Sequence, residues 1–351
     1  MKAAFVPLVV AMAAHLFAQS PCGEAIGPIP FQERGKWGYL SDKGVVIPPR
    51  FQIAGPFYSE GAIACADGQC GLIDRTGSFS TPTWERKSGP FPAGYSEELS
   101  PAISDGKWGY IDHMRTVVIP FQFLYAGNFN QGMARVRLSD KFFFIDKKGN
   151  RVTPEFDGAF DFHENLAAVE VGDNVGYIKR DGSFAIPADH GSASGIDFSE
   201  GLAAVRIHGK VGFMDKNGIV VIEPKFDDVF AFSNSRAPVQ QGGKWGYVDH
   251  KGNLAVPIKF DIGHMFSEGL ASVQTGGKWG YIDINGKYVI PAMFDAAMPF
   301  CGGVAQVETF QRIEEHDSCA LYKGKHGMID HRGNYVWRDA EDQTWRSPFC
   351  R

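Results

Sequence analysis

The stretch Lys244-Trp245-Gly246-Tyr247-Val248-Asp249 decides the fold, because copies of it recur along the chain. Close copies begin at Lys36, Lys107 and Lys278, and weaker copies begin at Gln69, Lys141, Asn174, Lys210 and Lys325. The glycine, or the residue in its place, falls at 38, 71, 109, 143, 176, 212, 246, 280 and 327. Successive copies are 33 to 38 residues apart, except the last, which follows after 47. Nine copies at one period predict a tandem array of one small structural unit.

One unit, taken over residues 198–232, is predicted to form three strands and an aromatic connector. The β-competent runs lie at 202–207, 211–215 and 220–222. Asn217-Gly218 suits a tight hairpin because both residues tolerate positive φ, and Pro224 is expected to end the third strand. Such a meander is too small to be stable alone, so each unit must pack against its neighbours.

The repeated aromatic residues are predicted to form the core between units. In an extended strand Trp245 and Tyr247 point to one face, while Gly246 and Val248 point to the other. The glycine is expected to leave room for a neighbouring unit. The predicted repeat core comprises Trp37, Trp108, Trp245, Trp279, Tyr39, Tyr110, Tyr247 and Tyr281.

Over roughly residues 29–338 the pattern resembles the bacterial WG, or KWG, repeat. It shares the turn Asp-Lys-Asn-Gly at 215–218, and Phe-Ser-Glu-Gly-Leu-Ala at 198–203 and again at 266–271. The aromatic hairpin is also distantly similar to cell-wall-binding repeats of the choline-binding type. The first resemblance implies an exported or surface-associated β-rich repeat protein and no particular activity.

The predicted fold is all-β, with about nine three-stranded meanders in tandem. Nine units exceed the four to eight blades typical of a propeller, which favours an open curved array. A bridge between Cys22 and Cys350 would bring the two ends together and would instead favour a closed propeller-like ring. The open array is the expected arrangement.

Composition and the N-terminus bound the class of protein. The chain has 351 residues, 44% of them apolar, and a net charge of −5, which excludes intrinsic disorder and argues against a nucleic-acid partner. Residues 1–18 predict a signal peptide, with Lys2 at its start, an apolar stretch over 3–17 and the small Ala18 at its end. The repeat array is assigned to 19–338 and a C-terminal tail to 339–351. We expect an exported protein (periplasmic, extracellular or on the cell surface) with no later membrane span.

All six cysteines follow the predicted cleavage point, and an even count in an exported chain predicts disulfides. The candidate pairs are Cys65 with Cys70, Cys301 with Cys319, and Cys22 with Cys350. The first pair brackets a four-residue turn and is the best supported. None of the cysteines has zinc-site spacing, so no metal or other cofactor is expected.

The recurrent polar residues are predicted to be structural rather than catalytic. The carboxylates that end the middle strand are Asp112, Asp146, Asp215, Asp249, Asp283 and Asp330. An Asp that enters a hairpin accepts backbone N–H groups, and catalysis would need one site rather than a copy in each unit. The same argument covers Glu60, Glu200 and Glu268 in the connectors. The histidines that follow the Asp in three units, His113, His250 and His331, are expected to be exposed turn residues.

The sequence is compatible with three functions. The favoured one is a non-catalytic scaffold that binds an unknown protein or cell-envelope component. The second is a carbohydrate or cell-wall binder, for which a glycan is the partner and the repeated tryptophans must be exposed in a row. The third is an enzyme whose site lies in the insertion at 308–320, expected to be a surface loop, with Glu314 and His316 as candidates.

Overall fold

The computed structural model describes residues 27–58, 61–80, 84–85, 91–92, 95–191, 197–316 and 319–346. Within these ranges the regular elements are strands and none is a helix, so the all-β prediction is confirmed. No helix in the described part of the chain has the length and apolarity needed to cross a membrane. The predicted signal peptide at 1–18 lies outside the described residues.

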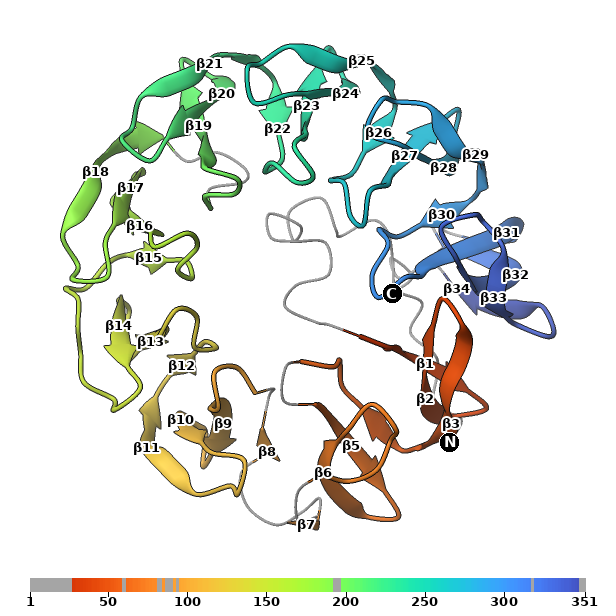
Figure 1. Cartoon of the computed structure of the whole chain (residues 1–351), viewed down its shortest axis with the longest axis horizontal. Coiled ribbons are helices and arrows are strands. Elements are labelled where there is room, and N and C mark those ends of the chain that lie inside the picture. Colours follow the sequence, from red (N-terminus) through yellow and green to blue (C-terminus); the bar gives the residue numbers. More distant parts are fainter. Residues whose placement is uncertain are drawn as a thin grey trace.

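The strands fall into nine successive units arranged in a ring (Figure 1), and units five and six are joined into one sheet by a single residue pair, Gly191 with Arg206. Unit one holds β1 (Ile29–Glu33), β2 (Lys36–Ser41) and β3 (Gly44–Phe51). Unit two holds β4 (Ile53–Ala54), β5 (Ala62–Ala66), β6 (Gln69–Ile73) and β7 (Trp84–Glu85). Unit three holds β8 (Phe91–Pro92), β9 (Ser100–Ser104), β10 (Lys107–Ile111) and β11 (Val117–Phe123). Unit four holds β12 (Tyr125–Ala126), β13 (Met133–Arg137) and β14 (Phe142–Asp146).

Units five to nine continue the series around the ring. Unit five holds β15 (Gly158–Ala159), β16 (Ala167–Val171), β17 (Asn174–Ile178) and β18 (Phe184–Gly191), and unit six holds β19 (Leu202–Ile207), β20 (Lys210–Asp215) and β21 (Val220–Phe226). Unit seven holds β22 (Asp228–Val229), β23 (Ala237–Gln241), β24 (Lys244–Val248) and β25 (Leu254–Phe260). Unit eight holds β26 (Ile262–Gly263), β27 (Ala271–Thr275), β28 (Lys278–Ile282) and β29 (Tyr288–Phe294). Unit nine holds β30 (Ala296–Ala297), β31 (Ala305–His316), β32 (Cys319–Ile329), β33 (Tyr335–Arg338) and β34 (Gln343–Arg346).

Unit seven illustrates the common sheet, in which sequence order is also spatial order and every pair is antiparallel. The outer strand bulges where it crosses the middle strand, because Trp245 pairs with Phe260 while Tyr247 pairs with Val256. A Cβ on Gly246 would lie 2.8 Å from the Val256 carbonyl oxygen. The glycine therefore makes room for the outer strand of its own unit, and the prediction that it accommodates a neighbouring unit is wrong.

The third strand also runs further than predicted. In unit six β21 continues through Pro224 to Phe226, and Val211 of the middle strand pairs with Phe226. Proline is tolerated there because β21 is the last strand of its sheet and the ladder is already bulged.

Neighbouring units pack face to face through their apolar side chains. In the contact between units six and seven, Phe213 and Ile222 pack with Phe232, Val239 and Val248. Where the repeat has tyrosine at this position, its hydroxyl adds a hydrogen bond to the next unit: Tyr247 donates to the His264 carbonyl at 2.8 Å, and Tyr281 to the Met298 carbonyl at 2.7 Å. Each small sheet is thus stabilised by apolar cores that it shares with the neighbouring units, as expected for a repeat array.

The predicted aromatic core is largely confirmed. Tyr39, Tyr110, Tyr247 and Tyr281 are all 0% exposed. Trp245 and Trp279 are buried, at 7% and 1% exposure, while Trp37 and Trp108 are half-buried. Burial of the tyrosine hydroxyls raises their pKa, so these groups stay protonated donors.

The array closes into a ring, so the preference for an open array is wrong. Phe31 of unit one packs against Trp337 of unit nine, with ring centroids 5.6 Å apart. Leu40, Val304 and Met328 are buried in the same cluster. This contact between the first and last units, which we call the seam, covers the two faces that an open array would leave exposed.

The insertion forms paired strands instead of the predicted loop. The β31–β32 ladder runs from the Ala305–Ile329 pair to the His316–Cys319 pair, with one register shift between Arg312 and Glu314. The segment assigned as a tail contributes β34, which pairs with β32 from Leu321 to Gly324. Unit nine therefore carries an extended sheet that the other units lack.

Four of the six cysteines lie among the described residues. Cys65 and Cys70 form the predicted disulfide between β5 and β6. Cys301 stands near the start of the β31–β32 ladder and Cys319 at its far end, roughly 35 Å away at 3.3 Å per residue. A disulfide needs about 7 Å or less between Cα atoms, so the pairing of Cys301 with Cys319 is wrong. Cys301 is nevertheless disulfide-bonded, and Cys22 and Cys350 lie outside the described residues.

Candidate functional site

A series of four-residue turns, here called the inner turns, precedes the first long strand of the units. The loops between β22 and β23 and between β26 and β27 project toward the middle of the ring (Figure 1). Each turn is closed by a short antiparallel bridge, as between Ser199 and Leu202 or Ser233 and Arg236. The middle residues adopt positive φ, with Glu200 at 52° and Gly201 at 84°. Glycine in the third place relieves this strain in four of the turns and Asn165 in another, whereas Glu98 and Ser235 adopt positive φ without that relief.

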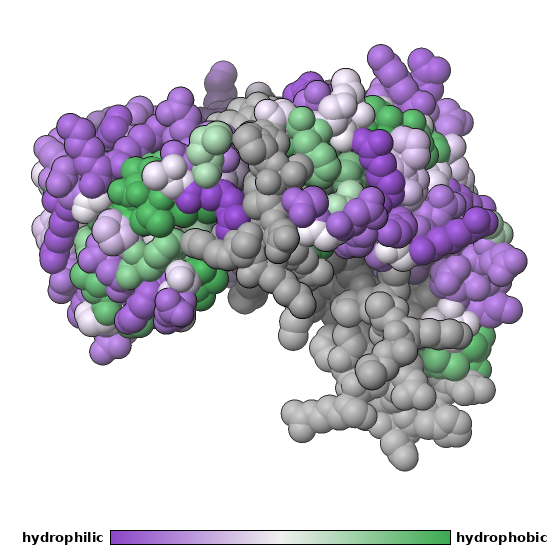
Figure 2. Space-filling view, turned by 90° about the horizontal axis from the view of Figure 1, so that it is seen from below, coloured by the Kyte–Doolittle hydropathy of each residue, from purple (hydrophilic) through white to green (hydrophobic). Residues whose placement is uncertain are grey.

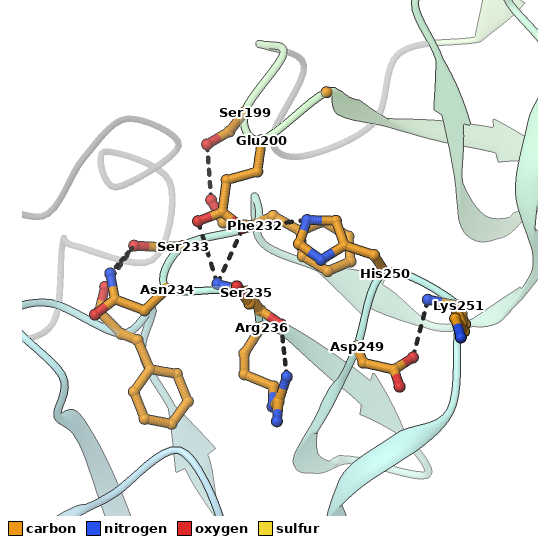
Figure 3. Close-up of polar contacts among 12 residues, drawn as sticks. Ser199, Glu200, Phe232, Ser233, Asn234, Ser235, Arg236, Asp249, His250 and Lys251 are labelled. Atoms are coloured by element: carbon orange, nitrogen blue, oxygen red, sulfur yellow. Dashed lines mark hydrogen bonds and ion pairs between the residues drawn. The ribbon is translucent and has the colours of Figure 1, made fainter.

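In units three to eight, the side chain of the second residue of the inner turn binds the next turn along the chain. The Glu200 carboxylate accepts a hydrogen bond from the Ser235 N–H at 3.0 Å (Figure 3). Equivalent bonds run from Gly132 N–H to Glu97, Asn165 N–H to Gln131, Gly201 N–H to Glu164, Gly269 N–H to Asn234, and Gly303 N–H to Glu268. The series is unbroken from unit three to unit nine. The predicted structural role of Glu200 and Glu268 is confirmed, but their partners lie in the next unit, while Glu60 lies outside the described residues.

The first residue of the inner turn forms a second series of bonds between units. The Ser233 hydroxyl donates to the Phe266 carbonyl at 2.7 Å, and the Ser267 hydroxyl donates to the Phe300 carbonyl at 2.6 Å. Ser96 and Ser199 donate in the same way to the carbonyls of Phe129 and Phe232. Cys301 replaces the serine in unit nine.

The three histidines are half-buried, so the expectation that they are exposed turn residues is wrong. His250 stacks on Phe232 at 4.3 Å between ring centroids, and its Nε2 lies 3.1 Å from the Glu200 carboxylate (Figure 3). His331 makes the equivalent contacts with Phe300 and Glu268, and His113 stacks on Tyr95. In units four and six the residue at this place is lysine, and Lys147 and Lys216 pair with Glu97 and Glu164. A lysine or histidine side chain thus ties the inner turns of units three, five, six and eight to the following unit.

The aspartates at the end of the middle strand are turn residues, as predicted. The Asp249 carboxylate accepts the backbone N–H groups of Lys251 and Asn253, each at 2.9 Å. The same pair of bonds is present at Asp112, Asp146, Asp215, Asp283 and Asp330. The Ile219 N–H bond holds the pKa of Asp215 below its usual range, as expected for a carboxylate that caps a turn. These groups are committed to the backbone.

One carboxylate departs from this pattern. Asp197 precedes the inner turn of unit six, where units seven and eight have Ala231 and Met265. It is 7% exposed, its Oδ2 lies 3.9 Å from His163 Nε2, and its Oδ1 has no hydrogen-bond partner among the described residues. Burial raises the pKa of Asp197 to about 6. Nothing in the repeat pattern singled this residue out, and only its contrast with Ala231 could have done so.

Seven segments of the chain match the family described as "WG containing repeat": residues 37–66, 108–142, 142–174, 176–210, 212–245, 245–279 and 279–309. Together they cover well over half of the sequence. The chain belongs to this family. The resemblance to the WG repeat is therefore confirmed, and a comparison with curated proteins by sequence finds no match.

Solved structures of low similarity accompany the family match. The Hsv2 protein of Kluyveromyces lactis, with loop 6CD replaced by a Gly-Ser linker, is 9% identical, with 73% of this chain and 99% of that chain covered and a TM-score of 0.41. The form with complete loop 6CD is 9% identical, over 82% and 95%, with a TM-score of 0.33. The β-propeller domain of Cps50 (Swd1) from Myceliophteria thermophila is 11% identical, over 63% and 94%, with a TM-score of 0.33. At such TM-scores these likenesses carry no argument about this chain.

The WG repeats account for most of the polar groups described above. The matched segments stop at residue 309, so His326 and the outer strand of unit nine lie beyond the matched region. Among the described residues, no group of three or more His, Cys, Asp or Glu side chains could hold a metal ion. The insertion candidates Glu314 and His316 lie in the distal part of β31, away from Asp197 and the inner turns.

Proposed function

We propose that this WG-repeat protein is an exported, non-catalytic ring-shaped scaffold that binds another protein or a component of the cell envelope. The proposal is supported by how the repeated polar groups are used. Glu200, His250 and Ser233 each bind a neighbouring unit, and Asp249 binds its own turn. These groups hold the ring together, which leaves the outer surface for recognition.

The outer strands carry the observation on which the binding proposal depends. One valine, just before a buried isoleucine, is exposed in each of four units: Val46 at 43%, Val118 at 42%, Val221 at 46% and Val289 at 43%. These valines lie on β3, β11, β21 and β29, the last strands of their sheets. Figure 2 shows hydrophobic side chains, in green, interrupting the hydrophilic surface on the flanks of the ring. We call Val46, Val118, Val221 and Val289 the rim valines.

The outer strands are protected against pairing with other strands. A proline follows shortly after each rim valine, at positions 48, 120, 224 and 291. Proline cannot donate a ladder hydrogen bond and so blunts an exposed sheet edge. A partner at the rim is therefore recognised by side-chain contact rather than by addition of a strand.

The buried tryptophans do not support a carbohydrate binder that stacks sugar rings on a row of the repeated tryptophans. Sugar stacking needs an exposed row of aromatic rings, whereas Trp279 is 1% and Trp245 7% exposed. Trp245 stacks on Phe230 within the packed interior, with centroids 5.0 Å apart.

The test uses the mature chain with all four rim valines changed to Thr, and a matched variant with the same valines changed to Ile. Threonine keeps the β-branched shape but removes apolar surface, whereas isoleucine retains it. We expect capture of a specific envelope protein by the wild-type and isoleucine proteins and at least about tenfold weaker capture by the threonine protein. Equal capture by all three would overturn the role of the rim. Binding on a glycan array with no protein partner would favour the alternative.

A further inference from the structure

Unit nine replaces three residues of the repeat together, at positions that face one another. In unit eight the middle-strand Trp279 is flanked by Gln274 on one side and Phe294 on the other. Unit seven has Gln240, Trp245 and Phe260 in the same register, and unit one has Gln32, Trp37 and Phe51. In unit nine the set becomes Glu308, His326 and Asp339. Neutral residues are thus exchanged for three ionisable ones at a single place.

The three side chains form one cluster, in which Glu308 and His326 are buried and Asp339 is half-buried. His326 Nδ1 lies 3.0 Å from Asp339 Oδ2, and the same carboxylate oxygen accepts the His326 backbone N–H at 3.0 Å. On the other side, His326 Nε2 lies 3.6 Å from Glu308 Oε1. Glu308 is 6% and His326 9% exposed. An imidazolium between two carboxylates balances part of their charge, whereas a neutral imidazole leaves two anions close together, one of them buried.

This cluster lies on the face of unit nine that forms the seam. Side chains alternate along a strand, so His326 shares a face with Met328, and Asp339 shares that face with Trp337. Met328 and Trp337 pack on Phe31 of unit one, while Val307 and Ile329 on the other face pack on unit eight. The unit-one residues in the seam cluster are apolar, namely Ile29, Phe31 and Leu40.

Further charges surround the cluster without neutralising it. Arg338, next to Asp339, directs its guanidinium to the Thr309 hydroxyl at 3.2 Å. Lys325, on the same strand as His326, directs its ammonium to the Ala340 carbonyl. Asp295 adds a negative charge that acts on Glu308, and Lys278 pairs with Asp295. The protonation state of His326 therefore determines the net charge of the cluster at the seam.

We propose that the cluster of Glu308, His326 and Asp339 makes closure of the ring depend on pH, with the seam held while His326 is protonated and loosened when it loses its proton.

The direction follows from two effects. Burial lowers the pKa of His326, but Asp339 and Glu308 raise it by more, so the net shift is upward. Burial raises the pKa of Glu308 as well, with His326 opposing. A group whose pKa is raised by folding stabilises the fold below its unfolded pKa and loses that contribution as pH rises through the folded pKa. Both groups therefore weaken the seam as pH increases.

Hydrogen exchange on the full chain with its disulfides intact tests this, with rates corrected for intrinsic exchange at each pH. Between about pH 5 and about pH 9 we expect protection of peptides from residues 29–51 and 319–338 to fall by about tenfold for each unit of pKa shift. Peptides from residues 228–260 serve as the internal control and should hold their protection. Equal loss in both regions would overturn the proposal.

Two variants separate the cluster from general pH effects. Glu308→Gln with His326→Trp and Asp339→Phe introduces the residues of units one, seven and eight and should abolish the pH response of the seam. Glu308→Gln with Asp339→Asn leaves a buried histidine without carboxylates, so the seam should instead weaken as pH falls. His250→Gln, which removes a histidine from unit seven, should leave the response unchanged. If the triple variant fails to fold, as judged by circular dichroism, the reversed sign in the double variant decides. A wild-type response in the double variant would refute the proposal.

Discussion

Units eight and nine share a strand order but differ in the side chains on the faces that pack against the next unit. Unit eight contacts its neighbours through Trp279, Tyr281 and Phe294, all almost fully buried. Unit nine has His326, Met328 and Asp339 at the corresponding places, and it carries the extended β31–β32–β34 sheet. A repeat backbone therefore tolerates a change from apolar to ionic packing where the array must meet its own beginning. Four tests by paired substitutions, in these and other units, break or sharpen this comparison.

The largest expected effect is at the glycine of the middle strand. A Cβ on Gly280 would lie 2.6 Å from both the Ile290 carbonyl oxygen and the Ala292 nitrogen, whereas on Gly327 it would meet mainly the ring of Tyr335. Backbone cannot move aside as a side chain can, so Gly280→Ala should cost about 3 kcal/mol and Gly327→Ala about 1 kcal/mol. Chemical denaturation of both variants measures the difference. Equal losses would show that the two units are not distinct in this respect.

A smaller effect is expected where Asp197 stands in place of the apolar residue of units seven and eight. Its raised pKa, about 6, means that the folded state favours the protonated acid, so stability is lost as pH rises through that value. Asp197→Asn should therefore raise the free energy of unfolding by about 2 kcal/mol at pH 7 and by little at pH 4. Denaturation at the two pH values measures this, with Asp173→Asn, an exposed site, as control. A gain that did not depend on pH would contradict it.

The tyrosine hydroxyl offers a third test. Tyr281→Phe removes the donor to the Met298 carbonyl and should cost about 1.5 kcal/mol, because a buried acceptor is left unpaired. Unit nine has Met328 at this place and lacks the hydroxyl, so Met328→Leu should cost less than about 1.5 kcal/mol. Thermal unfolding of the two variants gives the comparison. A cost for Tyr281→Phe indistinguishable from zero would mean that the bond adds nothing to the contact.

The smallest effect is expected at the inner turns. Glu200 and His250 are about one-third exposed, so solvent screens their ion pair, and Glu200→Gln should cost about 0.5 kcal/mol. A double-mutant cycle with His250→Gln isolates the pair from the hydrogen bond to Ser235. A coupling energy above about 2 kcal/mol would show that the inner turns hold the ring more firmly than the outer contacts do.

Local features of the fold were predictable, because a 34-residue period and strand alternation are properties of short segments. The strand expected at 202–207 is observed as Leu202–Ile207, and Asp249 binds its turn as expected. The contacts between units were not predictable in the same way. Glu200 and Ser235 are 35 residues apart, and nothing in either residue type specifies a partner in the following turn.

Closure of the ring depends on still longer distances. Phe31 and Trp337 meet across almost the whole chain, and the typical number of propeller blades pointed to the wrong arrangement. The insertion at 308–320 predicts a surface loop because insertions in repeat proteins map to loops, yet Phe310 and Tyr322 pack together at 5.1 Å between ring centroids across a hairpin. His326 and Asp197 could be noticed only by comparing each unit with its neighbours in register.

The inner-turn bonds all run in one direction, from an acceptor in one unit to a backbone donor in the next. During synthesis each unit therefore acquires its partner about 35 residues later, and the array can assemble in the order in which it leaves the ribosome. Unit one is the exception, since Phe31 is covered only after Trp337 has been made. The apolar face of unit one therefore stays uncovered until the rest of the chain has been made. The N-terminal strands are the part of the chain through which nascent molecules associate most readily with one another.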